Sequence, residues 1–187
     1  MRHYQGGSSN NVAAALHVGA LADAAGYSSF KAKPTFGGSD ESWFVGYNNT
    51  DATFSGKLIA KSVTKVGTGN WTIKGNENSS SITVKEGKLT IFNLSGSATT
   101  GTLTIAKGAT LAGSGTTNSL VAQAGAIIIP GLSETAVGTI KTNSNAIIQA
   151  GASMIINVSA TSNSKLNVKG SIFTMAGNDT IVIAPQD

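Results

Sequence analysis

The stretch ITVKEGKLTIFN, residues 82–93, decides the fold that this sequence predicts. Apolar and polar residues alternate before its glycine, at Ile82 and Val84, and again after it, at Leu89 and Ile91. Alternation with a period of two is typical of a β-strand with one buried face. The stretch therefore predicts two short strands joined by a turn at Gly87.

The same arrangement recurs along the chain. The later copies are LTIAKGATLAGSG (103–115), LVAQAGAIIIPG (120–131), AIIQAGASMIINV (146–158) and KLNVKGSIFTM (165–175). Their central glycines, which follow Gly87 at unequal intervals, are Gly108, Gly125, Gly151 and Gly170. An earlier copy, SVTKVGTGNWTIKG (62–75), has its turn near Gly69.

Repeats made only of short strands favour a β-solenoid over a β-sandwich. A sandwich would join neighbouring strands as hairpins, and the sequence contains neither an Asn-Gly nor an Asp-Gly pair. We therefore predict an all-β fold, a single-stranded right-handed parallel β-helix (β-solenoid) with coils of about 20 residues.

Stacked coils would join the apolar stripe of each coil into one interior column. The predicted members of this column are Ile82, Val84, Leu89, Ile91, Leu103, Ile105, Leu111, Ile127, Ile129, Ile148, Ile155, Val158, Val168 and Phe173.

The first part of the chain is less regular. The alanines of residues 11–30, with Asn11 as a cap, are compatible with a helix, whereas Leu16, Val18 and Gly19 favour a strand and a turn. Composition leaves both alternatives open. We expect residues 1–10 to be an artificial or disordered lead-in, and residues 11–187 to be a β-helix segment of a longer surface or secreted protein.

Composition excludes several classes of function. The chain has no cysteine, so neither disulfides nor thiolate chemistry is available. The formal charge of +4 comes from scattered lysines, and Arg2 is the only arginine, so we expect no nucleic-acid partner. Lysines such as Lys61, Lys65 and Lys85 are predicted to be solvated on exposed strand faces. The sequence also lacks a continuous apolar stretch long enough to span a membrane as a helix.

Several short sequence segments, taken in their order along the chain, resemble the passenger-associated transport repeat. This repeat occurs in β-helical autotransporter passenger domains and related bacterial surface proteins. The segments are FSG (54–56), TKVGTGNWTIKG (64–75), VKEGKLTI (84–91), GATLAGSGT (108–116) and PGLS (130–133). The signature residues that carry the resemblance are Phe54, Gly56, Lys65, Gly67, Gly69, Trp71, Gly75, Gly87, Gly108, Pro130 and Gly131. The resemblance covers roughly residues 16–184 and favours strand and loop over helix within residues 11–30.

The resemblance implies a non-catalytic structural stalk of an autotransporter-like or adhesin-like protein, which supports passenger folding and display outside the cell or at the bacterial surface. Its expected partners are flanking coils of the same longer chain, further copies joined end to end, and host or glycan surfaces. Two alternatives stay open. The segment is either an accessory β-helix of a carbohydrate-active or glycan-binding secreted protein, or itself a glycan hydrolase or lyase.

The residues predict no catalytic, metal or cofactor site. The loop GTGNWTIKG (67–75) leads into alternating residues rather than a helix, so it lacks the helix N-terminus that binds phosphate. Glycoside hydrolysis needs two paired carboxylates, and Glu77, Glu86 and Glu134 do not repeat one coil position. His17, between two apolar residues, is predicted to be an outward strand residue.

One group of aromatic residues is a candidate for ligand binding. Trp43, Phe44 and Tyr47 lie within the stretch DESWFVGYNN, residues 40–49. Aromatic rings at a surface are able to stack on sugars, so these three form a candidate glycan-stacking patch. The alternative is that they pack over an end or a side of the solenoid.

Overall fold

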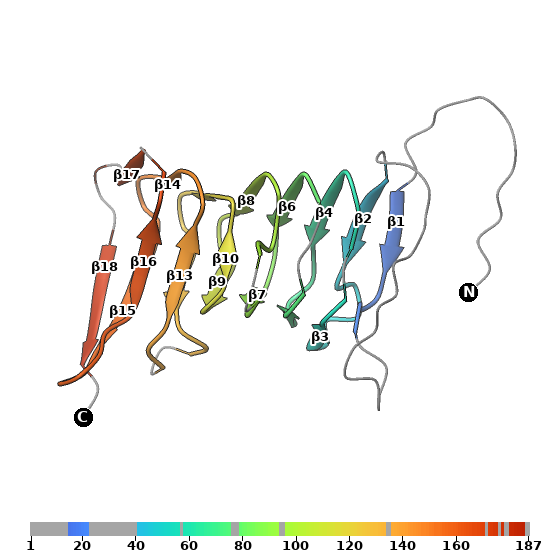
Figure 1. Ribbon diagram of the computed structural model, residues 1–187. Helices are drawn as coiled ribbons and strands as arrows, with labels where there is room; N and C mark the ends of the chain where they lie inside the picture. Colours follow the sequence, from blue (N-terminus) through green and yellow to red (C-terminus); the bar gives the residue numbers. More distant parts are fainter. Residues whose placement is uncertain are drawn as a thin grey trace, which may run out of the picture.

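A computed structural model, shown in Figure 1, describes residues 15–22, 41–56, 58–75, 79–93, 96–133, 136–170, 172–175, 177 and 180–185. These residues form strands, turns and loops, and no helix occurs among them. The strands lie along one axis, from β1 near the N-terminus to β18 near the C-terminus (Figure 1). The prediction of an all-β fold is confirmed.

The strands form three sheets. Sheet A contains β1 (Ala15–Val18), β2 (Ser42–Val45), β4 (Ser62–Lys65), β6 (Ser81–Val84), β8 (Thr102–Ile105), β11 (Ser119–Ala122), β14 (Ala146–Ile148) and β17 (Phe173–Met175). Sheet B contains β3 (Ala52–Phe54), β5 (Asn70–Ile73), β7 (Lys88–Ile91), β9 (Thr110–Gly113), β12 (Ile127–Pro130), β15 (Ser153–Val158) and β18 (Thr180–Pro185). Sheet C contains β10 (Thr116–Thr117), β13 (Thr139–Thr142) and β16 (Lys165–Val168).

Neighbouring strands within each sheet pair in parallel. Strands that follow one another in sequence mostly lie in different sheets, as β4, β5 and β6 do in sheets A, B and A. The chain therefore leaves each sheet after one short strand and returns to pair with that strand. This confirms parallel pairing and excludes the sandwich built from hairpins.

The length of chain between paired strands varies along the stack. A short step joins Thr102 of β8 to Ser119 of β11. A much longer step joins Ala146 of β14 to Phe173 of β17. Loops of unequal length absorb these differences, so the strands themselves stay in register.

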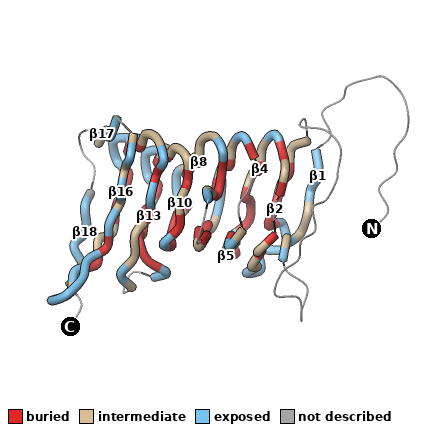
Figure 2. The backbone as a smooth tube through the Cα atoms, in the orientation of Figure 1, coloured by how far each residue is buried: buried red, intermediate tan, exposed pale blue. Residues whose placement is uncertain are grey.

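The core consists of columns of side chains that point inward from successive strands. In sheet A one column contains Trp43, Val63, Ile82, Leu103, Leu120 and Ala146, and a second contains Val45, Lys65, Val84, Ile105, Ala122 and Ile148. In sheet B the facing column contains Trp71, Leu89, Leu111, Ile128 and Met154. Figure 2 shows this burial recurring along the middle of the stack, with exposed backbone at both ends.

Eight of the predicted column residues lie in this core. They are Ile82, Val84, Leu89, Ile91, Leu103, Ile105, Leu111 and Ile148. We call one passage of the chain through the sheets a rung. Each rung thus contributes several aliphatic side chains to the core, and each fully buried side chain adds about 1.5–3 kcal/mol of transfer free energy.

The predictions for β12 and β15 were wrong by one residue. Ile127 and Ile155 are only partly buried, whereas Ile128 and Met154 occupy the inner column. Ile129 is buried outside the core cluster, in line with Ala112 of β9.

The prediction was also wrong for three residues near the C-terminal end, which are less buried in the structure than it required. Val168 packs only partly against the core, Val158 is 37% exposed and Phe173 is 50% exposed. Phe173 continues the column of Ala146, but no described strand pairs with β17 on its other side.

The segment of residues 1–30 is described only in part. Ala15–Val18 is strand β1, which pairs with β2, so a helix over most of residues 11–30 is wrong for the described portion. Asn11, residues 1–10 and residues 23–30 lie outside the described residues.

A repeated tight turn joins sheet A to sheet B. The amides of Ala109, Ala126 and Ala152 donate to the carbonyl three positions earlier, at 3.0, 2.9 and 3.0 Å. The residue before each alanine is a glycine with positive φ, as a type II turn requires, for example Gly108 at φ 77°. In the earlier copy the glycine with left-handed φ is Gly67, at 69°, so the predicted turn position, Gly69, was too late in the chain.

Candidate functional site

The signature residues are spread along the stack and do not form one pocket. Phe54 and Trp71 lie in the core, and Pro130 is buried in β12. Most glycines of the signature lie where a side chain would meet nearby backbone or strain a turn, whereas a Cβ at Gly56 would meet the ring of Phe54. The signature residues therefore specify how one rung sits on the next. The described loop from Gly67 to Gly69 joins two strands, β4 and β5.

Gly67 provides a direct test of this role. A Cβ at Gly67 would meet the carbonyl oxygen of Gly46 and the side chain of Asn49, at a backbone φ of 69°. A Cβ at Gly108 would meet nothing within 4 Å, at a φ of 77°. We expect Gly67→Ala to lower the free energy of unfolding by about 3 kcal/mol or more, and Gly108→Ala by only about 1–2 kcal/mol of left-handed strain.

Chemical denaturation of both glycine variants measures the difference. Equal losses in the two would show that backbone conformation alone, and not contact between rungs, explains the signature glycines.

Lys65 is the unexpected member of the core. It is 1% exposed and pairs in register with Val45 on one side and Val84 on the other. Its ammonium donates to the carbonyl oxygens of Val66 and Gly67, both at 2.7 Å, and to that of Glu86 at 3.3 Å. The prediction of a solvated lysine was wrong here, although Lys61 and Lys85 are exposed as predicted.

Lys65 lies at the corner where the chain turns from sheet A to sheet B. Burial lowers the pKa of its ammonium below the ordinary value, while the charges of Glu86 and Asp51 act in the opposite direction. Both carboxylates also accept backbone hydrogen bonds, Glu86 from Gly67 at 3.2 Å and Asp51 from Asn70 at 2.8 Å. The charged groups of this corner thus hold successive turns together.

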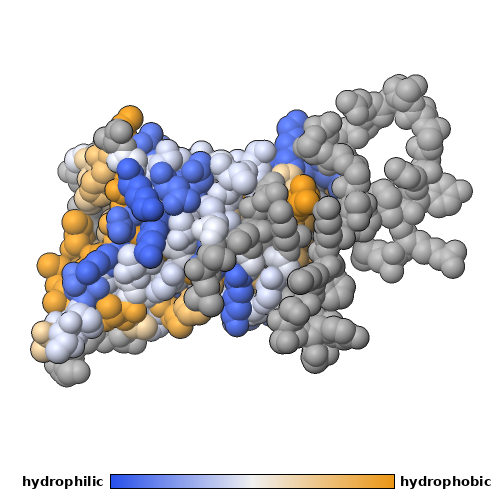
Figure 3. Space-filling view, in the orientation of Figure 1, coloured by the Kyte–Doolittle hydropathy of each residue, from blue (hydrophilic) through white to orange (hydrophobic). Residues whose placement is uncertain are grey.

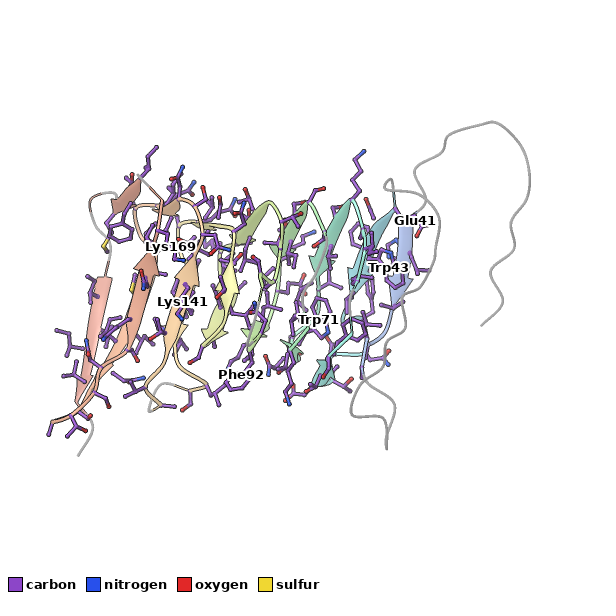
Figure 4. The ribbon with its side chains drawn as sticks, viewed as in Figure 1. Glu41, Trp43, Trp71, Phe92, Lys141 and Lys169 are labelled. Carbon is purple, nitrogen blue, oxygen red and sulfur yellow. The ribbon has the colours of Figure 1, made fainter. Side chains whose placement is uncertain are left out.

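The candidate glycan-stacking patch is divided between two faces of sheet A. Trp43 is 7% exposed and belongs to the core, so it is not available to a ligand. Phe44 is partly exposed on the opposite face, and Tyr47 is 49% exposed in the turn that follows. Figure 4 labels Trp43 on β2 and Trp71, the other core tryptophan, on β5.

His17 completes the outer aromatic group. Its ring stacks on Phe44 with centroids 4.6 Å apart and an angle of 4° between the rings. Its Nδ1 lies 2.8 Å from the hydroxyl of Tyr47. The prediction of an outward His17 is confirmed, but its membership of the group was missed. His17 lies far from Phe44 in sequence, and only the pairing of β1 with β2 joins them.

The described residues contain no group of three His, Cys, Asp or Glu side chains that could hold a metal ion. Glu77, Glu134 and His3 lie outside the described residues, so the predictions about them stay predictions. No helix in the described part of the chain is long and apolar enough to cross a membrane.

Comparisons with protein-family models, with characterised proteins and with solved structures found no match for this chain. The functional argument therefore depends on the geometry of the fold and of its surfaces.

Proposed function

We propose that the chain is a right-handed parallel β-helix with coils of about 20 residues, and that it serves as a non-catalytic stalk of an autotransporter-like or adhesin-like bacterial surface protein. The supporting observation is the register of the inner columns, which continue from strand to strand while the loops between them vary in length. Strands spaced about 4.8 Å apart make the eight strands of sheet A roughly 34 Å long.

Extension is the property that such a stack supplies. Each rung contacts only the rungs beside it, so length is gained by adding rungs without redesigning the core. The order of the signature segments resembles that of passenger-associated transport repeats, which supports a role in passenger folding and display.

The same geometry argues against catalysis by two of the described carboxylates. Glu86 and Asp51 each accept a backbone hydrogen bond that joins two turns. A carboxylate engaged in this way is a poor partner in a paired acid–base mechanism. We expect no turnover of pectins, chitin, xylans or host glycans. Turnover that is lost in Glu86→Gln would overturn the non-catalytic assignment.

Surface display is tested on cells. Antibodies against the chain should label intact source bacteria, and external protease should remove the label. Labelling that requires permeabilised cells would contradict the proposed location. The alternative, an accessory β-helix of a secreted glycan-binding or carbohydrate-active protein, predicts release into the medium together with that activity.

The C-terminal end of the stack is the expected contact with further coils. Ile181 and Ile183 continue inner positions of β15, yet they are 52% and 66% exposed. Val182, 43% exposed, alternates to the other face of β18. Figure 3 shows apolar surface gathered at this end. A flanking coil of a longer chain, or a second copy, would cover these side chains.

Sedimentation across a concentration series tests association through this end. We expect the chain to associate, and Ile183→Lys to weaken that association by placing a charge against the next rung. The sequence alone predicts that Val182→Lys would weaken this contact, but Val182 pairs with Ile155 on the other face of β18, so Val182→Lys serves as the matched control. A chain that stays monomeric at high concentration would contradict association between copies.

A further inference from the structure

The outer face of sheet A carries a regular array of hydroxyl groups. In β2, β4, β6, β8 and β11 the positions that alternate with core residues point outward. These positions are Ser42, Phe44, Ser62, Thr64, Ser81, Thr83, Thr102, Thr104, Ser119 and Val121. Every one is partly exposed, eight carry a hydroxyl group and none is charged.

Strand register aligns these side chains in two columns along the stack. Ser42, Ser62, Ser81, Thr102 and Ser119 form the first, and Phe44, Thr64, Thr83, Thr104 and Val121 form the second. Adjacent positions in a column lie one strand spacing, about 4.8 Å, apart along the backbone, and the columns are separated by about 6.7 Å. The side chains of β2 and β4 already interact, since the Ser62 hydroxyl donates to that of Ser42 at 2.9 Å.

The aromatic group of His17, Phe44 and Tyr47 lies at the N-terminal end of the second column. Phe44 precedes Thr64 in register, and His17 of β1 stacks on Phe44. The Tyr47 hydroxyl fixes Nδ1 of the imidazole, which leaves Nε2 as its second hydrogen-bonding atom. Aromatic rings that are fixed in place in this way offer apolar surface together with polar atoms at their edges.

We propose that this face binds a linear, uncharged polysaccharide that lies along the stack, with one sugar ring on the His17–Phe44–Tyr47 group and the following sugars on the hydroxyl columns. A pyranose has an apolar C–H face and a rim of hydroxyls, which match the rings and the Ser/Thr side chains in turn. The length of one sugar unit is close to one strand spacing, so each rung meets an equivalent part of the ligand.

Two further features favour this ligand. Threonine is β-branched and stiff at χ1, so Thr64, Thr83 and Thr104 lose little entropy when they bind. The absence of charge on these ten positions matches a neutral polymer better than an acidic one. Acidic glycans would instead suit the exposed lysines of sheet C and its following turn, Lys141 and Lys169, which Figure 4 labels.

Affinity electrophoresis and calorimetry with the whole chain test the proposal. The probes are soluble neutral polysaccharides (a β-glucan, a mannan and a neutral xylan) and two acidic ones (polygalacturonate and alginate). We expect binding to at least one neutral polymer, and a loss of about tenfold or more in Tyr47→Ala and in Thr83→Lys. Asn167→Lys, which adds the same charge on exposed sheet C, should leave binding unchanged.

Circular dichroism melts confirm that each variant is folded, so a loss of binding reports on the face itself. Failure to bind any neutral polymer would overturn the proposal. Binding that Tyr47→Ala and Thr83→Lys leave intact would do the same, as would binding to acidic polymers alone. The proposal does not depend on the stalk function, because the stack would extend equally well with this face unused.

Discussion

Lys65→Met lowers the free energy of unfolding by about 2–4 kcal/mol, because it removes the charged donor from two buried carbonyl oxygens. Methionine fits the apolar column between Val45 and Val84, so the loss is one of hydrogen bonds and not of packing. The carbonyls of Val66 and Gly67 then stay inside the stack without the ammonium that they accept from at 2.7 Å. Urea unfolding followed by circular dichroism measures the change.

Ile105→Met is the matched control. Ile105 lies two rungs further along the same column and is fully buried. The substitution conserves volume and disturbs no polar group, so it should cost less than about 1.5 kcal/mol. If both variants lose the same stability, the ammonium of Lys65 contributes nothing beyond its packing.

The pH dependence of the same pair tests the charge. Burial lowers the pKa of Lys65 in the folded protein below 10.5, and the unfolded chain keeps the ordinary value. At a pH between these two pKa values the unfolded state binds more protons than the folded state. The free energy of unfolding of the parent chain therefore rises with pH relative to that of Lys65→Met. Below the folded pKa both states are protonated and the difference between the two proteins is constant. A difference that falls as the pH approaches 10.5 would contradict the burial of a charged ammonium.

Trp71→Ala is expected to lower the free energy of unfolding by about 3–5 kcal/mol. Trp71 is 1% exposed and lies between Ala52 and Leu89 in the inner column of sheet B. Its Nε1 also donates to the carbonyl of Leu21 at 3.0 Å, which joins β5 to a segment far earlier in the chain. The truncation leaves a cavity near the N-terminal end of the stack and removes that connection.

Phenylalanine substitutions separate the hydrogen bond from the volume. Trp71→Phe loses the bond to Leu21 together with part of the ring. Trp43→Phe loses a similar volume, but the buried Nε1 of Trp43 has no hydrogen-bond partner among the described residues. Removing an unsatisfied donor offsets the cost, so Trp71→Phe should be less stable than Trp43→Phe by about 1–3 kcal/mol. Equal thermal unfolding of the two would show that the Leu21 bond contributes no net stability.

Alternation around glycines was sufficient to predict the fold class and most of the core. Ile82, Val84 and Leu89 each have polar neighbours on both sides, so only one face is available for burial, and all three are buried. Gly87, Gly108, Gly125 and Gly151 were predictable for a similar reason, since their turns need a positive φ that glycine adopts without strain. The prediction of an equivalent turn at Gly170 was wrong, because Gly170 has no positive φ and lies between β16 of sheet C and β17 of sheet A.

Alternation is uninformative where apolar residues are consecutive. AIIIPG (126–131) and ASMIINV (152–158) allow either face to be the buried one, and the prediction chose the wrong one at Ile127 and Ile155. A signal was present in the spacing from the turn. Leu111 is the third residue after Gly108, and Ile128 is likewise the third after Gly125.

The sequence by itself determined the parallel, all-β repeat, because period-two alternation and left-handed glycines are local properties of the chain. Only the tertiary structure decided which side chains meet across rungs. Lys65 is buried because the carbonyls of its own turn and of the next rung converge on its ammonium. His17 joins Phe44 and Tyr47 because β1 pairs with β2, and Phe173 stays exposed because burial in a stack depends on the next rung as well as on the residue itself.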